Sequence, residues 1–156
     1  MRSMHPEELA RFALRPPSEV EWEDLLIRLE IVPRVVRNAL EEADAADPRL
    51  VELLGTLVER EARVGQWLEG IAAAAVGANS ATQTAESTPE DADWLSRRFA
   101  SLRARTFVMV QRRGLEVWGW AGEVGGDQSA TVHQVLSWLA ERDGIALLDL
   151  RRATRC

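Results

Sequence analysis

Four segments of this chain carry apolar residues at the spacing of an α-helix, and each segment is bounded by residues that start or stop helices. Amphipathic helices of this kind bury their apolar stripes against one another. We therefore expect an all-α fold, a four-helix bundle that forms one domain over residues 18–153 between an N-terminal tail, 1–17, and a C-terminal tail, 154–156. The spacing predicts helices over residues 18–43, 48–75, 89–113 and 130–153.

Capping residues locate two of the four helix starts. Ser18 and Glu21 have the spacing of a capping box, as do Thr131 and Gln134, and in such a box each side chain accepts a hydrogen bond from the other residue's backbone N–H. Pro33 falls inside the first predicted helix. Because proline lacks the N–H group and crowds the preceding turn, we expect it to kink this helix or to split it in two.

Prolines and glycines mark the remaining boundaries. Asp47-Pro48 and Thr88-Pro89 each place a cap before a proline, which the first helical position tolerates. Residues Val76 to Ser87 are small and polar, so they predict a long linker between the second and third helices. Gly114 ends the third helix, and a crossing rich in glycine and tryptophan, with room for a short extended piece, leads to the fourth.

The third predicted helix combines an apolar stripe with a basic surface. Six arginines and no acid lie between Arg97 and Arg113, whereas the first helix is rich in glutamate. We interpret these arginines as a solvated face that complements the charge of the first helix. The apolar stripe comprises Leu95, Phe99, Leu102, Thr106 and Val110.

Composition and charge oppose several classes of function. The net charge of −6 opposes broad binding to nucleic acid or to anionic membranes, which need a cationic surface. No lysine is present, so Schiff-base and Walker-type lysine chemistry are excluded. The only cysteine, Cys156, is the last residue, and no run of about 20 apolar residues occurs. We expect a cytoplasmic protein without an internal disulfide or a membrane segment.

The chain resembles the DinB/YfiT-like superfamily of metalloenzymes in three stretches, RLEIVPRVVRNAL, VELLGTLVEREARVGQWL and TVHQVLSWLAERDGIALLDLRR. Their order and spacing extend the resemblance from about Leu25 to Arg152. It implies an up-down-down-up four-helix bundle that forms a homodimer. Members of this superfamily typically present three histidines to one divalent metal, such as nickel or zinc, with one histidine on the second helix and two at i and i+4 on the fourth.

The three ligand positions of that superfamily align with Thr56, Arg142 and Ala146, none of which is a histidine. Glu61 and Asp143 match the acidic residues that accompany the ligands. The resemblance therefore implies a divergent member that keeps the frame of the metal site and has lost the metal. We expect no metal and no other cofactor.

Arg142 is the most informative replacement, because an arginine at an inward-facing position must be paired. One interpretation is a structural salt bridge with Glu61 and Asp143. The alternative is a pocket in which Arg142 binds a small anionic ligand, a carboxylate or a phosphate, through two hydrogen bonds. The two histidines are not candidate ligands. His133 precedes Arg142 by nine residues, about 180° around the helix, and His5 lies in the N-terminal tail.

Tryptophans extend the candidate pocket. Trp118 and Trp120 lie in the glycine-rich crossing rather than on a helical stripe, so they are placed to line a pocket mouth. Trp138, on the fourth helix, is included with them. The candidate pocket accordingly comprises Glu61, Trp118, Trp120, Trp138, Arg142 and Asp143, with no catalytic residue among them.

We expect a DinB-like protein that has lost its metal, is related to stress, and acts as a small-molecule-binding or interaction protein rather than as a catalyst. The alternative is a metal- or thiol-dependent transferase or hydrolase of the same superfamily, in which Glu61 or Asp143 would act as general base. A second alternative is a nucleic-acid binder associated with DNA damage, which the acidic net charge opposes.

Overall fold

The computed structural model describes residues 6–12, 15–76, 91–112, 114–125 and 128–155. Helices account for most of them, which confirms the expected all-α class, and a small two-stranded sheet is added to it. The four long helices are α1 (Glu19–Leu40), α2 (Pro48–Val76), α3 (Ala92–Gln111) and α4 (Val132–Thr154). The short elements are the 3₁₀ helices η1 (Pro6–Arg11) and η2 (Leu115–Gly119) and the strands β1 (Ala121–Gly125) and β2 (Gln128–Thr131).

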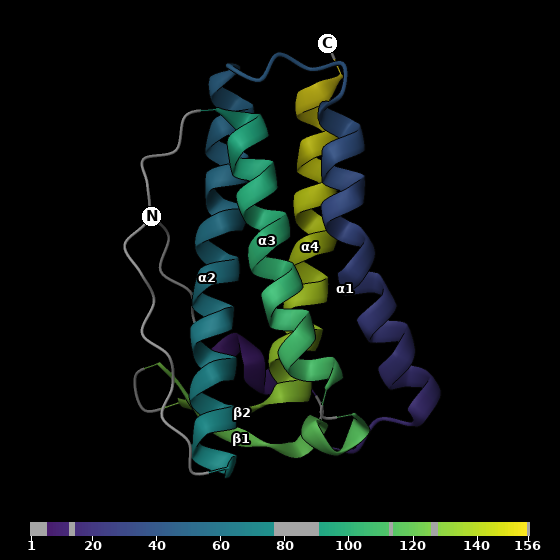
Figure 1. The fold of residues 1–156 in the computed structure, drawn as a ribbon, viewed down its shortest axis with the longest axis vertical. Helices are drawn as coiled ribbons and strands as arrows, with labels where there is room; N and C mark the ends of the chain where they lie inside the picture. Colours follow the sequence, from purple (N-terminus) through teal and green to yellow (C-terminus); the bar gives the residue numbers. More distant parts are fainter. Residues whose placement is uncertain (1–5, 13–14, 77–90, 113, 126–127, 156) are drawn as a thin grey trace.

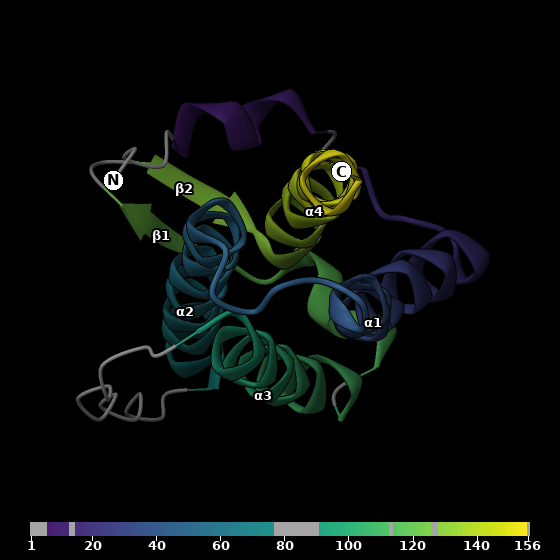
Figure 2. The ribbon, with the colours of Figure 1, turned by 90° about the horizontal axis from the view of Figure 1, so that it is seen from above.

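The four long helices lie side by side (Figure 1). Viewed along their axes, α1 contacts α3 and α4, and α2 contacts the same two helices from the other side (Figure 2). α1 and α4 run toward one end of the molecule, whereas α2 and α3 run toward the other. η1 packs on the outer side of α4 (Figure 2). None of the described helices is both long and apolar enough to cross a membrane.

Local capping interactions start the helices as the sequence predicts. The backbone N–H of Glu21 donates to the Ser18 hydroxyl at 3.1 Å, and the side chain of Glu21 accepts from the backbone N–H of Ser18 at 3.4 Å. Thr131 and Gln134 form the same box at the start of α4, with distances of 3.1 and 3.0 Å. Both predicted capping boxes are therefore confirmed. Asp47 caps α2 through a 2.9 Å hydrogen bond from the backbone N–H of Arg49.

Three further features bear on the predicted helices. α1 continues through Pro33 as one helix that bends along its length (Figure 1), so of the two expected outcomes, a kink or a split, the split does not occur. α3 begins at Ala92 and is capped by Asp91, whereas the predicted start at Thr88-Pro89 and most of the predicted linker lie outside the described residues. The N-terminal tail contains η1, whose Leu9 is buried against the bundle, because a short helix with an apolar side chain gains by covering the core.

The crossing between α3 and α4 folds into η2 and a two-stranded antiparallel sheet. Ala121 pairs with Thr131 and Gly122 with Ala130, and a register shift lies between Glu123 and Gly125. The sheet rests on the C-terminal half of α2, where Gly122 approaches Ile71 so closely that a Cβ atom there would stand 2.9 Å from the Ile71 Cγ1. The short extended piece expected in this crossing is therefore present as a hairpin.

The apolar core consists of two clusters, one in each half of the bundle. The cluster nearer the sheet includes Leu29, Val64 and Leu139, and the cluster at the other end includes Val36, Leu54 and Leu150. All five residues of the predicted α3 stripe are buried, namely Leu95, Phe99, Leu102, Thr106 and Val110. Between the two clusters lies a layer of buried charged side chains, which is where the candidate functional site begins.

Candidate functional site

Arg103 of α3 lies at the centre of the bundle and binds the other three long helices. Its Nε donates to both carboxylate oxygens of Glu61 on α2, at 2.9 and 2.8 Å. Its Nη1 and Nη2 donate to the two carboxylate oxygens of Asp143 on α4, at 2.9 and 3.0 Å. Nη1 also donates to the backbone carbonyl of Leu29 on α1, at 2.7 Å. All three charged side chains are at most 3% exposed.

Pro33 explains why the Leu29 carbonyl is free to accept this bond. In an α-helix the carbonyl of residue 29 accepts from the N–H of residue 33, and proline has no N–H to donate. A proline inside a helix costs about 3 kcal/mol partly for this reason. Here the guanidinium of Arg103 replaces the missing donor with a charge-assisted hydrogen bond. Pro33 and Arg103 therefore form one structural unit, although they are far apart in the sequence.

The charges of the buried side chains Glu61, Arg103 and Asp143 stabilise one another as an ion cluster. Burial raises the pKa of the Glu61 carboxyl, and the nearby positive charge of Arg103 opposes that shift. Burial lowers the pKa of Arg103, but the two carboxylates outweigh it and hold the pKa above its ordinary value. Arg103 is thus a permanent cation between two buried acids. Such an arrangement is stable only when every partner is present.

The structure brings Glu61 and Asp143 together as predicted, but Arg103, not Arg142, joins them. Arg142 is half-buried and pairs with Glu8 of η1, and its guanidinium carbon lies 5.8 Å from the centre of the Trp138 ring. The predicted ion pair of Arg142 with Glu61 and Asp143 is therefore wrong. Adjacent residues of a helix point about 100° apart. When Asp143 faces the interior, Arg142 faces the outer side, where η1 supplies a carboxylate from the chain itself.

Thr56 and Ala146, the other two positions that the resemblance aligned with metal ligands, do not converge on a common point. Thr56 is exposed, and its hydroxyl donates back to the carbonyl of Glu52 at 3.2 Å. Ala146 is buried in the apolar cluster that contains Leu150. Within the described ranges, no group of three or more histidine, cysteine, aspartate or glutamate side chains is arranged to hold a metal ion.

The tryptophans belong to the apolar core and not to the ion cluster. Trp118 and Trp120 are half-buried and pack against the cluster nearer the sheet. Trp138 is buried and donates from its Nε1 to Glu8 at 3.1 Å. None of these three tryptophans lines the groove that opens beside Glu61 between α2 and α3. The six residues of the predicted pocket therefore do not surround one common cavity. His133 is half-buried near the Trp22 ring, and burial lowers its pKa.

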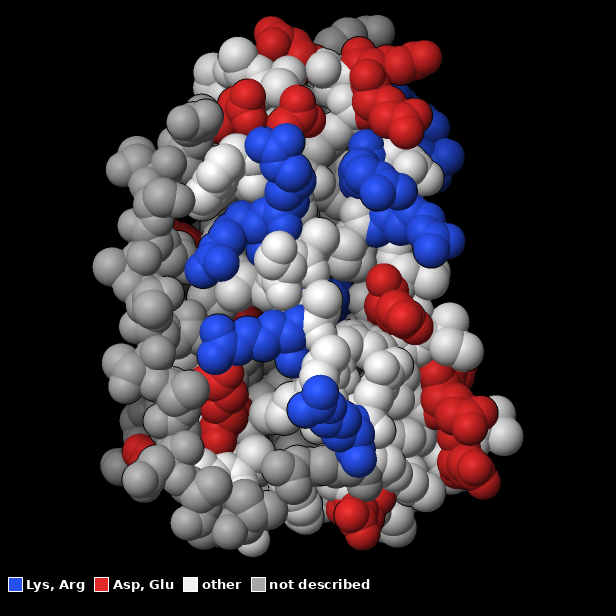
Figure 3. All heavy atoms as spheres, in the orientation of Figure 1, with Lys and Arg blue, Asp and Glu red and all other residues white. Residues whose placement is uncertain are grey.

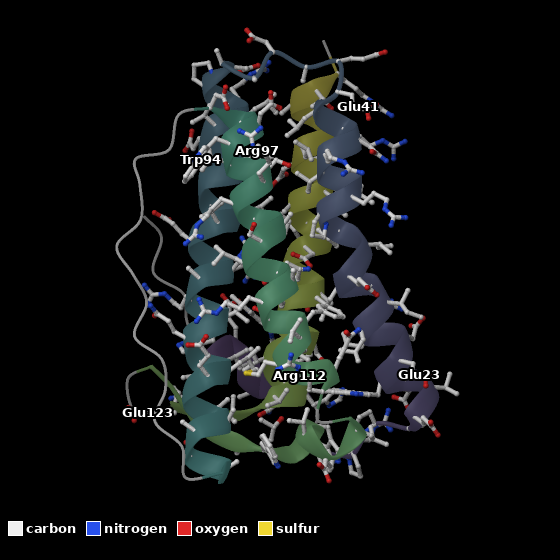
Figure 4. The ribbon with its side chains drawn as sticks, viewed as in Figure 1. Glu23, Glu41, Trp94, Arg97, Arg112 and Glu123 are labelled. Carbon is white, nitrogen blue, oxygen red and sulfur yellow. The ribbon has the colours of Figure 1, made fainter. Side chains whose placement is uncertain are left out.

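A groove between α2 and α3 opens beside Glu61 and has a volume of about 460 Å³. Arg105 and Glu69 form a 3.1 Å ion pair at its edge, and Arg112 lies toward the C-terminal end of α3 (Figure 4). Arginine side chains gather over α3 on this face of the molecule (Figure 3). The apolar part of the lining comes from Ala62, Gly65, Leu102, Val108 and Met109.

Sequence reasoning missed both Arg103 and this groove. Arg103 follows Phe99 by four residues and precedes Phe107 by four, and both aromatic residues are buried. This spacing of four residues from two buried aromatic residues indicates the inner face of the helix, and it is the signal in the sequence that could have identified Arg103. The groove has no comparable sequence pattern, because small and large side chains from two different helices shape it.

Glu8 allows a test of how η1 is held. Hydrogen bonds from Trp138 and Arg142 lower the pKa of Glu8, so its contribution to stability is present above the ordinary glutamate pKa of about 4.3 and is lost as the pH falls through the lowered value. We expect Glu8→Gln to reduce the free energy of unfolding at pH 7 by about 0.5–1.5 kcal/mol. The deficit should shrink below about pH 4.

Urea unfolding of both proteins at neutral and acidic pH measures this difference. Glu123→Gln, at an exposed position on β1, is the control that should change little at either pH (Figure 4). An equal loss for Glu8→Gln at both pH values would contradict the assignment of Glu8 as the charged partner of Arg142.

Comparisons of the chain with protein-family models, with curated proteins and with solved structures find no match.

Proposed function

We propose that this chain is a small-molecule-binding protein whose ligand lies in the groove between α2 and α3. We also propose that the bundle is of the up-down-down-up DinB-like type, with its former metal site replaced by the Arg103 cluster. The observation that carries the proposed function is the groove itself, which combines apolar side chains of α3 with arginines at its edge. Ligand sites in proteins are concave, mostly apolar and contain a few polar groups that orient the ligand.

The charges around the groove favour an anionic ligand. Arg103 pairs with Glu61 from the inside, and Arg105 pairs with Glu69 at the edge. Arg112 forms no ion pair with any residue that the structure describes, so its charge remains for a ligand. The large apolar side chains of the groove, Leu102, Val108 and Met109, lie on α3 with Arg112. An amphipathic carboxylate or phosphate monoester, with its anionic group at Arg112 and its apolar part against Met109, therefore matches the site best.

Gly65 provides a way to close the groove without disturbing the core. A Cβ atom at Gly65 would have only the Thr106 hydroxyl within 4 Å, at 3.8 Å, so a larger side chain can extend into the groove. Gly70 lies on the same helix, outside the groove, and a Cβ atom there would have no neighbour within 4 Å. Gly65→Phe and Gly70→Phe are therefore a matched pair, because both remove a helical glycine.

Octanoate and octanol are suitable probes, because they share an apolar chain and differ in charge. We expect octanoate to shift the backbone amide NMR signals of α2 and α3 in the wild-type protein and in Gly70→Phe. Gly65→Phe should abolish this binding, and Arg112→Gln should weaken it roughly tenfold. Octanol should bind the wild-type protein more weakly than octanoate does. The two probes should bind Arg112→Gln with equal affinity.

Three outcomes would contradict the proposed function. The first is that octanoate does not bind the wild-type protein. The second is that Gly65→Phe binds as well as Gly70→Phe, which would place the ligand elsewhere. The third is that octanol binds as tightly as octanoate, which would remove the role of Arg112 in recognition.

A further inference from the structure

Two buried arginine nitrogen atoms have no hydrogen-bond partner among the residues that the structure describes. They are Nη1 of Arg60 on α2 and Nε of Arg142 on α4. Buried N–H groups in proteins are almost always paired with an acceptor, because burial removes the water that would otherwise serve them. Two such donors on helices that contact one another indicate an acceptor from outside the chain.

Arg60 and Arg142 lie at the same level of the bundle. Glu61 and Asp143, the residues that follow them, both bind the guanidinium of Arg103, which aligns α2 with α4 at this point. Each arginine is turned by about 100° from the buried acid beside it. Burial lowers the pKa of Arg60, the charge of Asp143 opposes this shift, and the positive charge of Arg142 adds to it. The two guanidinium groups are therefore near one another.

A pair of tryptophans supports this arrangement. The rings of Trp67 on α2 and Trp138 on α4 lie 6.1 Å apart. Arg60 precedes Trp67 by seven residues, and Arg142 follows Trp138 by four, so each arginine shares a helix face with its tryptophan. Because α2 and α4 run in opposite directions, both steps lead toward the same end of the molecule (Figure 1). The two arginines thus lie on the same side of the tryptophan pair.

Glu8 of η1 supplies one anionic group at this place. Its Oε2 accepts a hydrogen bond from Nη2 of Arg142 and another, at 3.1 Å, from Nε1 of Trp138. η1 lies across the outer side of α4 (Figure 2), and the Glu8 side chain is 29% exposed, so solvent reaches this edge. The carboxylate serves these two donors but not Nη1 of Arg60 or Nε of Arg142.

The buried acids are directed to Arg103 and not to these two donors. Both oxygens of Glu61 accept from Nε of Arg103, and the two oxygens of Asp143 accept from its terminal nitrogens. Their negative charge reaches Arg60 from a distance, but they do not accept a hydrogen bond from it. What Arg60 and Arg142 lack is an acceptor with several oxygen atoms.

We propose that Arg60, Trp138 and Arg142 bind a phosphate group, which replaces the carboxylate of Glu8. Nε and Nη2 lie on one edge of a guanidinium, and together they form the two parallel hydrogen bonds by which arginine binds phosphate. Glu8 uses only Nη2 of this edge. A phosphate group has more acceptor oxygens than a carboxylate and a higher negative charge, so it can also accept from Nη1 of Arg60 and Nε1 of Trp138.

This site differs from both anion sites considered so far. One interpretation of the sequence placed an anion at Arg142 beside Glu61 and Asp143, whereas Arg142 is turned away from these acids and pairs with Glu8. The groove between α2 and α3 shares none of the three binding residues. Binding at the two places can therefore be measured separately.

Titration of inorganic phosphate into the full chain, at constant ionic strength with chloride as the reference anion, tests the site. The NMR signal of the Trp138 indole N–H, assigned with Trp138→Phe, reports binding at this place. We expect a saturable shift in the wild-type protein and roughly tenfold weaker binding by Arg60→Gln. Arg97→Gln removes the same charge from an exposed position on α3 and should bind as the wild-type protein does (Figure 4).

Glu8→Gln tests the replacement of the carboxylate. Glu8 belongs to the same chain and competes with phosphate for Arg142 and Trp138, so removal of its charge should tighten phosphate binding roughly tenfold. A gain of affinity requires a folded protein, so this variant remains informative even if Arg60→Gln is unstable. Methyl phosphate identifies the source of the group: equal binding of both probes indicates a monoester, and binding of inorganic phosphate alone indicates the free ion.

Three results would overturn the proposal. The first is that neither probe gives a saturable shift of the Trp138 signal. The second is that Arg60→Gln binds phosphate as tightly as Arg97→Gln, which would leave Arg60 without a role. The third is that Glu8→Gln binds phosphate no more tightly than the wild-type protein, because phosphate would then not take the place of the Glu8 carboxylate.

Discussion

Replacement of Arg103 by methionine is expected to lower the free energy of unfolding by about 3–5 kcal/mol. The substitution keeps most of the side-chain volume and removes the cation, so Glu61 and Asp143 are left as uncompensated buried acids. It also leaves the Leu29 carbonyl without its donor. Denaturant unfolding monitored by tryptophan fluorescence measures the loss.

Two comparisons separate the ion cluster from general effects of the substitution. Arg97→Met, at an exposed position on the same helix, should change stability by less than about 0.5 kcal/mol (Figure 4). The triple variant Glu61→Leu/Arg103→Met/Asp143→Leu should recover most of the loss, because replacing a whole buried ion cluster by apolar side chains is often nearly neutral.

The triple variant still lacks a partner for the Leu29 carbonyl, which costs about 1–3 kcal/mol. Pro33→Ala restores a backbone N–H at the position that serves this carbonyl in a helix. We therefore expect Pro33→Ala to stabilise the triple variant more than it stabilises the wild-type protein. A loss below about 1 kcal/mol for Arg103→Met alone would contradict the whole assignment.

Gly122→Val is expected to destabilise the protein by about 1–3 kcal/mol through overpacking. A Cβ atom at this position would stand 2.9 Å from the Cγ1 and 3.3 Å from the Cα of Ile71, and the second of these atoms belongs to the backbone of α2. The side chain of Ile71 can rotate away, but the backbone cannot, so β1 must move off the helix.

Gly119→Val is the matched control for this prediction. Gly119 lies in the same crossing, and a Cβ atom there would have no neighbour within 4 Å. Neither glycine has a positive φ, so the comparison isolates steric contact from backbone strain. Thermal unfolding should show a lower midpoint for Gly122→Val than for Gly119→Val. Equal midpoints would mean that the sheet does not rest on α2 as described.

The helices were predictable because their signals are local. The capping boxes at Ser18 and Thr131 depend on residues three positions apart, and both form as expected. The buried stripe of α3 follows from apolar spacing alone. Glu61 and Asp143 were identified in another way, as the acidic residues that the resemblance to the DinB/YfiT-like superfamily implies beside the ligand positions, and both are buried.

Which arginine pairs with Glu61 and Asp143 could not be predicted from local patterns. Arginine is usually exposed, so a cluster of six arginines on one helix favoured a solvated face, and Arg103 was counted among them. Arg142 was preferred because the resemblance aligned it with a metal-ligand position that would face inward. The structure reverses this choice through contacts between segments 40 and 42 residues apart, which local patterns do not report. Arg142 and its partner Glu8 of η1 are separated by even more of the sequence, 134 residues.

The unit formed by Pro33, Glu61, Arg103 and Asp143 has a consequence for descent. Each of the four long helices contributes one of these residues, and none of them is well suited to its place without the others. A proline in mid-helix, two buried acids and a buried arginine are each unfavourable alone. Selection should therefore act on the four positions jointly. Chains that share this ancestry are expected to keep all four residues or to have replaced them together, which makes the quartet a more durable mark of kinship than overall similarity.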